Sequence, residues 1–184
     1  PIDPPVGAPT WLQKDRAYQK AAAEFYSLDY ANAKVHFAEI AQDTESPWAE
    51  TADYLVARTL IRRASLTSSV MAAKPYYEEA EVHLEKFVSK SGKFAASAER
   101  MLGLIKYRLH PKERVGELAK ILSFQTGNDN FKQDLIDYTW LLDKFEAEAI
   151  QAEEKRKAAI EAAKNGNTNT VPPTDPDTDS NKVP

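Results

Sequence analysis

"AKVHF", residues Ala33–Phe37, returns 47 residues later as "AEVHL", residues Ala80–Leu84. Around each copy, apolar residues follow one another at steps of 3, 4 and 3 positions. They are Tyr30, Ala33, Phe37 and Ile40 in the first stretch, and Tyr77, Ala80, Leu84 and Phe87 in the second. Residues at these steps share one face of an α-helix. Each copy follows another amphipathic helix, and a helix pair that repeats at a fixed period predicts an α-solenoid.

The sequence also predicts helices in the rest of the chain up to residue 164. Glycine is scarce, with 6 in 184 residues, and no stretch alternates apolar and polar residues over the length of a strand. We expect Pro47 and Pro75 at first helical positions, where a missing N–H costs nothing, and a long loop over Leu66–Lys74. The predicted helices are 12–27, 30–43, 47–66, 75–91, 94–109, 111–124 and 130–164. This pattern predicts an all-α fold of about seven helices arranged as antiparallel pairs.

Proline marks both ends of the chain as non-helical. Residues 1–11 begin with PIDPPVGAP, and proline removes backbone donors, so we expect an extended leader there. Residues 165–184 contain four prolines and almost no apolar side chains, so burial cannot offset the entropy of ordering them. We therefore expect a helical-repeat domain over 12–164 and a disordered linker or tail over 165–184.

Composition excludes some classes of function. The net charge of −4 argues against nucleic acid as a partner, because phosphates are normally met by clustered Lys and Arg. No apolar run approaches the roughly 20 residues that span a bilayer. There is no cysteine, so disulfides and thiolate chemistry are excluded. The start at Pro1 favours a processed form or a fragment, and the compartment stays open, with a slight lean toward a periplasmic or other extracytoplasmic bacterial location.

Catalytic motifs are missing from the sequence. There is no G-x-S-x-G, no phosphate-binding glycine loop and no H-E-x-x-H. His36 and His83 occupy equivalent positions in the repeat, which raises the question of a shared metal ion. Equivalent positions on neighbouring helix pairs lie about 10 Å apart, and bonds of about 2 Å cannot reach both. We therefore expect no catalytic residue and no metal at these histidines.

The tail offers one further metal-like pattern. Asp175, Asp177 and Asp179 have the D-x-D-x-D spacing that begins an EF-hand calcium loop. The sixth position of that loop needs glycine and is Ser180 here, and the closing glutamate would lie beyond the last residue. We expect a solvated linker, and no cofactor of any kind.

The stretch SLDYANAKVHFAEIAQD resembles the second helix of a tetratricopeptide repeat. Asp29–Tyr30, Ala33 and Phe37 match the motif D-Y-x-x-A-x-x-x-F, and Ala21 falls where the first helix of that repeat has its small packing residue. The chain departs from the pattern in having Leu28 where a glycine usually separates the helices, and in a period of 47 instead of 34 residues. The resemblance implies a right-handed α-solenoid that binds other proteins.

Three further stretches are similar to the N-terminal part of larger bacterial tetratricopeptide-like proteins whose roles are uncharacterised. These are SPWAETADYLVARTLIRRAS, KFAASAERMLGLIKYRLHP and DLIDYTWLLDKF. This likeness implies that the chain is a piece of something longer, and it implies no activity.

The predicted third helix is apolar nearly all round, as expected of a helix between two neighbours. Its narrow polar stripe contains Thr51, Arg58, Arg62 and Ser65. The two arginines have two interpretations: they line a groove that meets an acidic peptide or a C-terminal carboxylate, or they form ion pairs inside the protein.

First helices line the binding groove of tetratricopeptide proteins, which carries over to Tyr18, Ala22, Phe25 and Tyr26. The basic clamp that some members use for C-terminal carboxylates is not matched at these positions. The predicted partner-binding residues are Tyr18, Ala22, Phe25, Tyr26, Arg58 and Arg62. We expect a non-enzymatic protein-interaction or assembly module, with a structural spacer as the alternative; an enzyme fragment has no support in the sequence.

Overall fold

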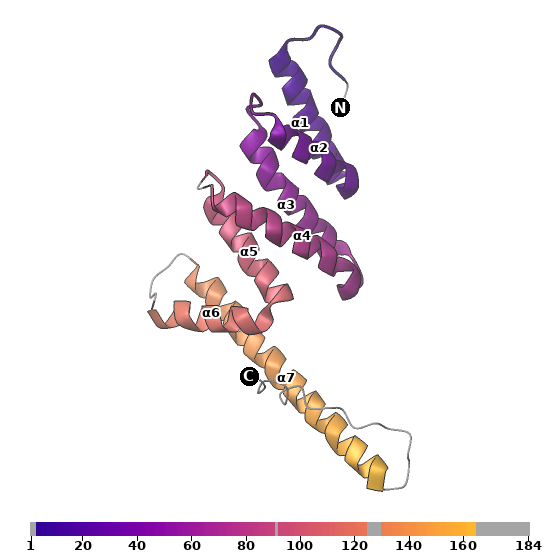
Figure 1. The fold of residues 1–184 in the computed structure, drawn as a ribbon, viewed down its shortest axis with the longest axis vertical. Coiled ribbons are helices and arrows are strands. Elements are labelled where there is room, and N and C mark those ends of the chain that lie inside the picture. Colours follow the sequence, from indigo (N-terminus) through magenta and orange to yellow (C-terminus); the bar gives the residue numbers. More distant parts are fainter. Residues whose placement is uncertain (1–2, 91, 125–129, 165–184) are drawn as a thin grey trace, which may run out of the picture. The chain divides into compact units, whose positions relative to one another are not determined.

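The computed structural model of the chain describes residues 3–90, 92–124 and 130–164 (Figure 1). In these ranges the chain forms seven α-helices and no strand, which confirms the all-α prediction. The helices are α1 Thr10–Tyr26, α2 Tyr30–Gln42, α3 Ala49–Leu66, α4 Val70–Val88, α5 Ala95–Leu109, α6 Pro111–Phe124 and α7 Phe131–Lys164. The chain divides into two compact units, Pro1–Arg114 and Val115–Pro184, and the boundary lies within α6.

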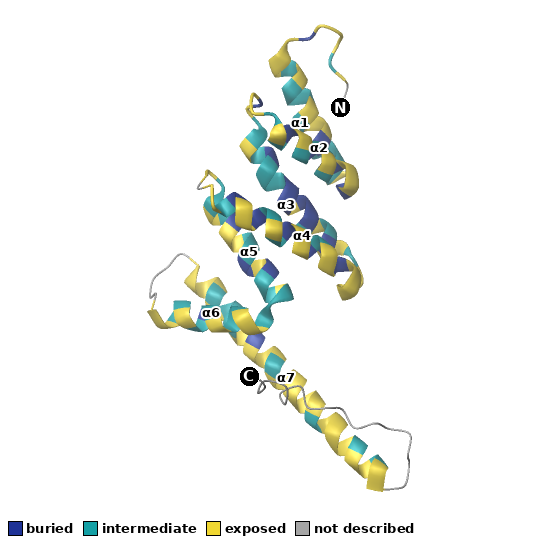
Figure 2. Ribbon diagram, in the orientation of Figure 1, coloured by how far each residue is buried: buried dark blue, intermediate teal, exposed yellow. Residues whose placement is uncertain are grey.

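The two repeated apolar faces form the core of the first unit. All eight residues of the 3, 4, 3 pattern are buried, with exposed fractions of 8% or less, as Figure 2 shows for α2 and α4. Ala33 and Ala80 are fully buried, and their small side chains leave room for a neighbouring helix. Helices that follow one another in the chain, from α1 to α5, pack on each other. The fold thus buries the faces that the repeated phrase identified.

Helix α3 packs against both α2 and α4. Its buried residues are Ala52, Val56, Ala57, Thr59, Leu60 and Ala64. The hydroxyl of Thr59 donates a hydrogen bond of 2.8 Å to the carbonyl oxygen of Leu55, so this buried polar group is satisfied within the helix. The expectation of a helix wedged between neighbours is met.

The turn between α1 and α2 depends on Leu28. It has φ 68°, and among the described residues it is the one non-glycine residue with a positive φ. The N–H of Leu28 bonds to the carbonyl of Phe25, and that of Asp29 to the carbonyl of Glu24, which is the Schellman pattern of helix ends. Asp29 then caps α2 by accepting from the N–H of Asn32 at 3.3 Å. A leucine therefore adopts the conformation for which glycine is the usual residue.

The prediction of a long loop over Leu66–Lys74 is wrong, because most of these residues are helical. Helix α4 begins at Val70, and the Ser69 hydroxyl caps it by accepting from the N–H of Ala72 at 3.4 Å. Pro75 lies inside α4 instead of at its start. Pro75 lacks the N–H that would bond to the carbonyl oxygen of Met71, and both residues are exposed, so that oxygen is accessible to solvent. The long repeat period therefore comes from added helix.

Other helix boundaries shift by smaller amounts. Helix α3 begins at Ala49 instead of 47, with Trp48 as N-cap residue, and the Ser46 hydroxyl accepts from the Trp48 N–H at 3.2 Å. Helix α1 begins at Thr10, so the last two residues assigned to the leader are helical. Helix α4 ends at Val88, three residues earlier than predicted.

The second unit contains the 34-residue helix α7. Leu118 of α6 and Leu141 of α7 are fully buried. From Glu146 onward α7 is exposed at most positions, and ion pairs along its own surface support it. The Arg156 guanidinium donates to both carboxylate oxygens of Glu153, at 2.9 and 3.0 Å, and holds the pKa of Glu153 below its ordinary value.

The predictions for 165–184, the calcium-like aspartates included, lie outside the described residues. No described helix combines the length and the apolar character that crossing a membrane requires.

Candidate partner-binding site

Helices α1 and α3 border a common hollow of about 230 Å³, here called the α1–α3 hollow. Five of the six predicted site residues line it: Tyr18, Ala22, Phe25, Tyr26 and Arg58. Arg62, one turn further along α3, does not. The structure therefore brings together most of the predicted site residues. They come from two helices that are distant in the sequence, since Tyr18 of α1 and Tyr54 of α3 are separated by 36 positions.

An aromatic stack fixes the α1 side of the hollow. The Trp48 indole lies on the Tyr18 ring, with centroids 4.4 Å apart and 14° between the planes. The Trp48 Nε1–H donates to an Asp15 carboxylate oxygen at 2.7 Å, which satisfies the indole and holds its orientation. Tyr18 also contacts Phe37 of the core, at 6.1 Å between centroids. Tyr18 is therefore packed between Trp48 and Phe37 in the wall of the hollow.

A second stack repeats this arrangement one helix pair later. The Phe94 ring lies on the Tyr54 ring, with centroids 4.6 Å apart and 9° between the planes. Trp48 and Phe94 are the N-cap residues of α3 and α5 respectively. Each places its ring on a tyrosine of the preceding first helix.

Sequence reasoning missed this second repeat, although a signal for it exists. The stretches WAETA and FAASA, 46 residues apart, share an aromatic residue followed by alanine at the first and fourth positions after it. Ala52 and Ala98, the fourth-position alanines, are both fully buried. Phe94 and Tyr54, neither of them proposed as site residues, both line the α1–α3 hollow.

The rim of the hollow contains an exposed aromatic side chain. Tyr26 is 81% exposed and meets Phe25 edge-on, with centroids 5.5 Å apart. Phe25 in turn packs edge-on against Tyr30 of the core at 5.6 Å. The hollow thus has a supported aromatic floor and one large ring free to contact a ligand.

Arg58 supplies the charge of the hollow. Its guanidinium lies 5.8 Å from the Tyr54 ring centroid, within cation–π range. Arg58 and Arg62 are both exposed, and neither forms an ion pair with a carboxylate in residues 3–90, 92–124 or 130–164. Internal ion pairs, the competing interpretation of these arginines, are therefore not found in the described part of the chain.

The three histidines each pair with a carboxylate of another helix. His36 contacts Glu24 at 2.6 Å, His83 contacts Asp53 at 3.0 Å, and His110 contacts Glu81 at 3.0 Å. These contacts link α1 to α2, α3 to α4, and the end of α5 to α4. Within the described residues, no three potential metal-ligating side chains gather in one place. The equivalent positions of His36 and His83 thus correspond to two separate helix–helix contacts.

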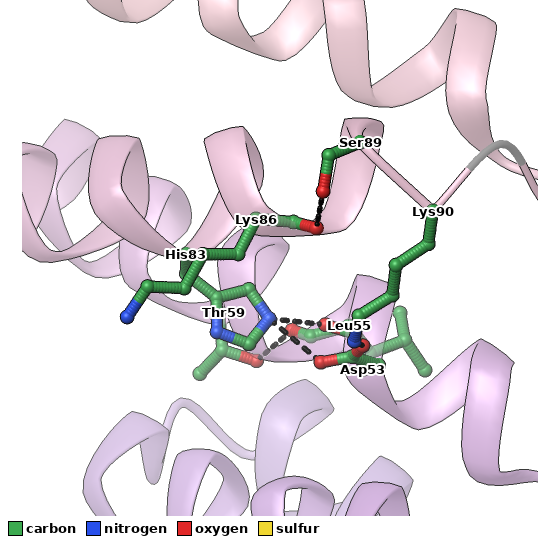
Figure 3. A network of polar contacts seen from close by, with 7 residues as sticks. All are labelled: Asp53, Leu55, Thr59, His83, Lys86, Ser89 and Lys90. Atoms are coloured by element: carbon green, nitrogen blue, oxygen red, sulfur yellow. Dashed lines mark hydrogen bonds and ion pairs between the residues drawn. The ribbon is translucent and has the colours of Figure 1, made fainter.

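Figure 3 shows how the second of these contacts is built. His83 Nε2 lies 2.8 Å from the backbone carbonyl oxygen of Asp53, which can only accept, so this nitrogen carries the hydrogen. The Lys90 ammonium pairs with the Asp53 side chain, at 2.9 Å from Asp53 Oδ2. His83 in α4 and Lys90 just after α4 therefore both contact Asp53, near the start of α3.

A larger hollow of about 460 Å³ lies between the leader, α1 and α2. Its charged lining is mixed, with Arg16 and Lys20 beside Asp3, Glu39 and Asp43. The Lys14 ammonium donates to Asp43 at 3.2 Å and lowers the pKa of that carboxyl. Acids and bases thus both line this hollow, whereas Arg58 gives the α1–α3 hollow a single sign of charge.

No family model, curated protein or solved structure matches the chain.

Proposed function

We propose that this chain is a non-enzymatic protein-interaction module of tetratricopeptide type, a right-handed solenoid of antiparallel helix pairs that binds its partner in the α1–α3 hollow. The observation that carries the proposal is the convergence of aromatic rings from α1 and α3 on one hollow that also contains Arg58. Aromatic residues and arginine dominate the energetics of protein interfaces. Leu28 supports the type of repeat, because its left-handed conformation falls where tetratricopeptide repeats usually have glycine.

The size and chemistry of the hollow define the partner. A hollow of about 230 Å³ accommodates side chains of one peptide segment. The aromatic floor fits an apolar side chain, and Arg58, which has no carboxylate partner among the described residues, fits a carboxylate next to it. The ligand is therefore a peptide with an apolar residue close to an acidic side chain.

A peptide selection tests this proposal. The immobilised chain is exposed to a random peptide library, and the affinities of the selected peptides are measured for wild type and for Tyr26→Ala. We expect selected peptides to combine apolar and acidic residues, and Tyr26→Ala to weaken them about tenfold. The matched control is Val35→Ala, whose side chain is 50% exposed on α2 away from the hollow. Peptides that bind Tyr26→Ala as tightly as wild type would contradict the proposal.

A spacer is the second candidate function, and α7 is the observation that favours it. The helix continues for 18 residues beyond Glu146 to Lys164, and most of these side chains are exposed. A polar helix of this kind holds the segments at its two ends apart without packing against either. If the spacer function is the whole function, the chain selects no peptide at the α1–α3 hollow.

A further inference from the structure

The connection between α3 and α4 has an unusual charge. Residues 54–77 contain Arg58, Arg62, Arg63 and Lys74 and no aspartate or glutamate, in a protein whose net charge is −4. The two helices meet in the middle of this segment, between Leu66 and Val70. The end of α3 and the start of α4 thus form a basic corner, here called the α3–α4 corner.

Three apolar side chains protrude at the α3–α4 corner. Leu66 is 52% exposed, Val70 is 87% exposed and Met71 is 80% exposed. Figure 2 shows the end of α3 and the start of α4 as exposed. Val70 and Met71 are adjacent in the first turn of α4, so both protrude at the same corner. Such exposure of neighbouring large apolar side chains marks an interaction site when it is bordered by polar groups.

Cations border these side chains. A hollow of about 330 Å³ at the corner is lined by Val70, Met71 and Tyr77 together with Lys74 and Arg108, and no carboxylate lines it. Arg108 comes from the last turn of α5, so a third helix contributes to the surface.

Little negative charge neutralises the cations of the corner. Within the described ranges, Arg62, Arg63 and Arg108 form no ion pair with a carboxylate; Arg63 instead lies over the Tyr76 ring at 4.3 Å. Lys74 contacts Glu78 at 3.4 Å, and both side chains are about half exposed, so this pair is weak.

We propose that the α3–α4 corner docks on an anionic lipid surface. The protruding Val70 and Met71 enter the interface between headgroups and acyl chains, while Lys74 and Arg108 contact the anionic headgroups. A nucleic acid would meet the cations but would leave the apolar side chains in water. The site is separate from the α1–α3 hollow, so the chain can bind a peptide and a membrane surface together.

Vesicle sedimentation of the full chain tests the proposal. Wild type is expected to sediment with vesicles of an equal mixture of phosphatidylglycerol and phosphatidylcholine, and to stay in solution with phosphatidylcholine alone. The double variant Lys74→Gln with Arg108→Gln is expected to bind the anionic vesicles more than about tenfold more weakly, since each cation near such a surface contributes about fivefold. Val70→Ser with Met71→Ser is expected to have a similar effect, because it removes the apolar contact.

Matched controls come from exposed residues away from the corner. Lys86→Gln with Arg100→Gln removes two exposed cations of α4 and α5 away from the corner, and Val35→Ser with Val82→Ser removes two exposed valines. Both double variants should bind the anionic vesicles like wild type. If they lose binding as strongly as the corner variants, the attraction is general and the proposal is wrong.

A fluorescent reporter tests insertion directly. The chain has no cysteine of its own, so a single introduced cysteine takes the label. Met71→Cys labelled with an environment-sensitive dye should brighten on anionic vesicles, and Val82→Cys with the same label should not. Absence of sedimentation with anionic vesicles, or capture of an acidic amphipathic peptide at the corner without any vesicle binding, would overturn the proposal.

Discussion

The Trp48 indole is stacked on the Tyr18 ring, with 14° between the planes and 4.4 Å from centroid to centroid. Trp48 precedes α3, and Tyr18 lies in the middle of α1, so the stack ties one first helix to the next. Phe94 and Tyr54 repeat the relationship at 4.6 Å. Three of these four rings, Tyr18, Tyr54 and Phe94, line the α1–α3 hollow.

Trp48→Ala should lower the free energy of unfolding by about 2–4 kcal/mol, because it removes a large, partly buried ring and its stack. In a double-mutant cycle with Tyr18→Ala, the coupling energy between the two rings should be about 1 kcal/mol. Chemical denaturation measures both quantities. Trp11→Ala is the control, since Trp11 is 63% exposed and its loss should cost less than about 0.5 kcal/mol. Additive effects of Trp48→Ala and Tyr18→Ala would show that the stack contributes nothing.

Phe37→Ala and Leu84→Ala should each destabilise the first unit by about 2–5 kcal/mol, because each leaves a cavity in the core. Phe37 is 1% exposed and Leu84 is fully buried. Val35→Ala and Val82→Ala provide controls at neighbouring positions of the same two helices, and their exposed side chains should cost little. Thermal midpoints that stay unchanged in both core variants would remove the argument from the repeated phrase.

Leu28→Gly should stabilise the protein by about 0.5–1 kcal/mol, because a side chain at φ 68° is strained and glycine is not. Little packing is lost, since Leu28 is 62% exposed. Val35→Gly, in the helical part of α2, should have the opposite effect and destabilise by about 0.5 kcal/mol, the difference between the helix propensities of valine and glycine. Equal destabilisation by both glycines in a denaturant titration would show that the turn does not strain Leu28.

Lys14→Met should raise the pKa of Asp43 toward its ordinary value, because the hydrogen bond from Lys14 is the main cause of its lowering. A carboxyl whose pKa is lower in the folded state adds stability above the pKa of the unfolded chain and loses it as the pH falls through the folded pKa. The stability difference between wild type and Lys14→Met should therefore be present near neutral pH and disappear in acid. Carboxyl chemical shifts during an NMR titration measure the pKa. A titration of Asp43 identical in both proteins would exclude the role of Lys14.

The sequence predicted the helices and the buried faces because periodic apolar residues determine both. It failed at Val70–Lys74, where alanines and a serine cap outweigh the proline that was expected to start the helix. The stacking of Trp48 on Tyr18 and of Phe94 on Tyr54 was also missed. The repeat of WAETA as FAASA is visible in the sequence, but which ring each aromatic residue meets, 30 to 40 positions away, follows from packing. The same limit explains why Arg62 was wrongly expected beside Arg58 at the hollow. A helical wheel shows that the two arginines share a face of α3, but it does not show which turn of the helix borders the hollow.

Arg58 and Arg62 offer the most direct test of the proposed binding site. Both are exposed arginines of α3 without a carboxylate partner in the described chain, yet only Arg58 lines the α1–α3 hollow. The measurement is the affinity of one selected peptide for Arg58→Ala and for Arg62→Ala, with circular dichroism to establish that both variants fold. We expect Arg58→Ala to weaken binding about tenfold or more and Arg62→Ala to change it by less than about twofold. Equal affinities of the two variants for the peptide would contradict binding in the α1–α3 hollow.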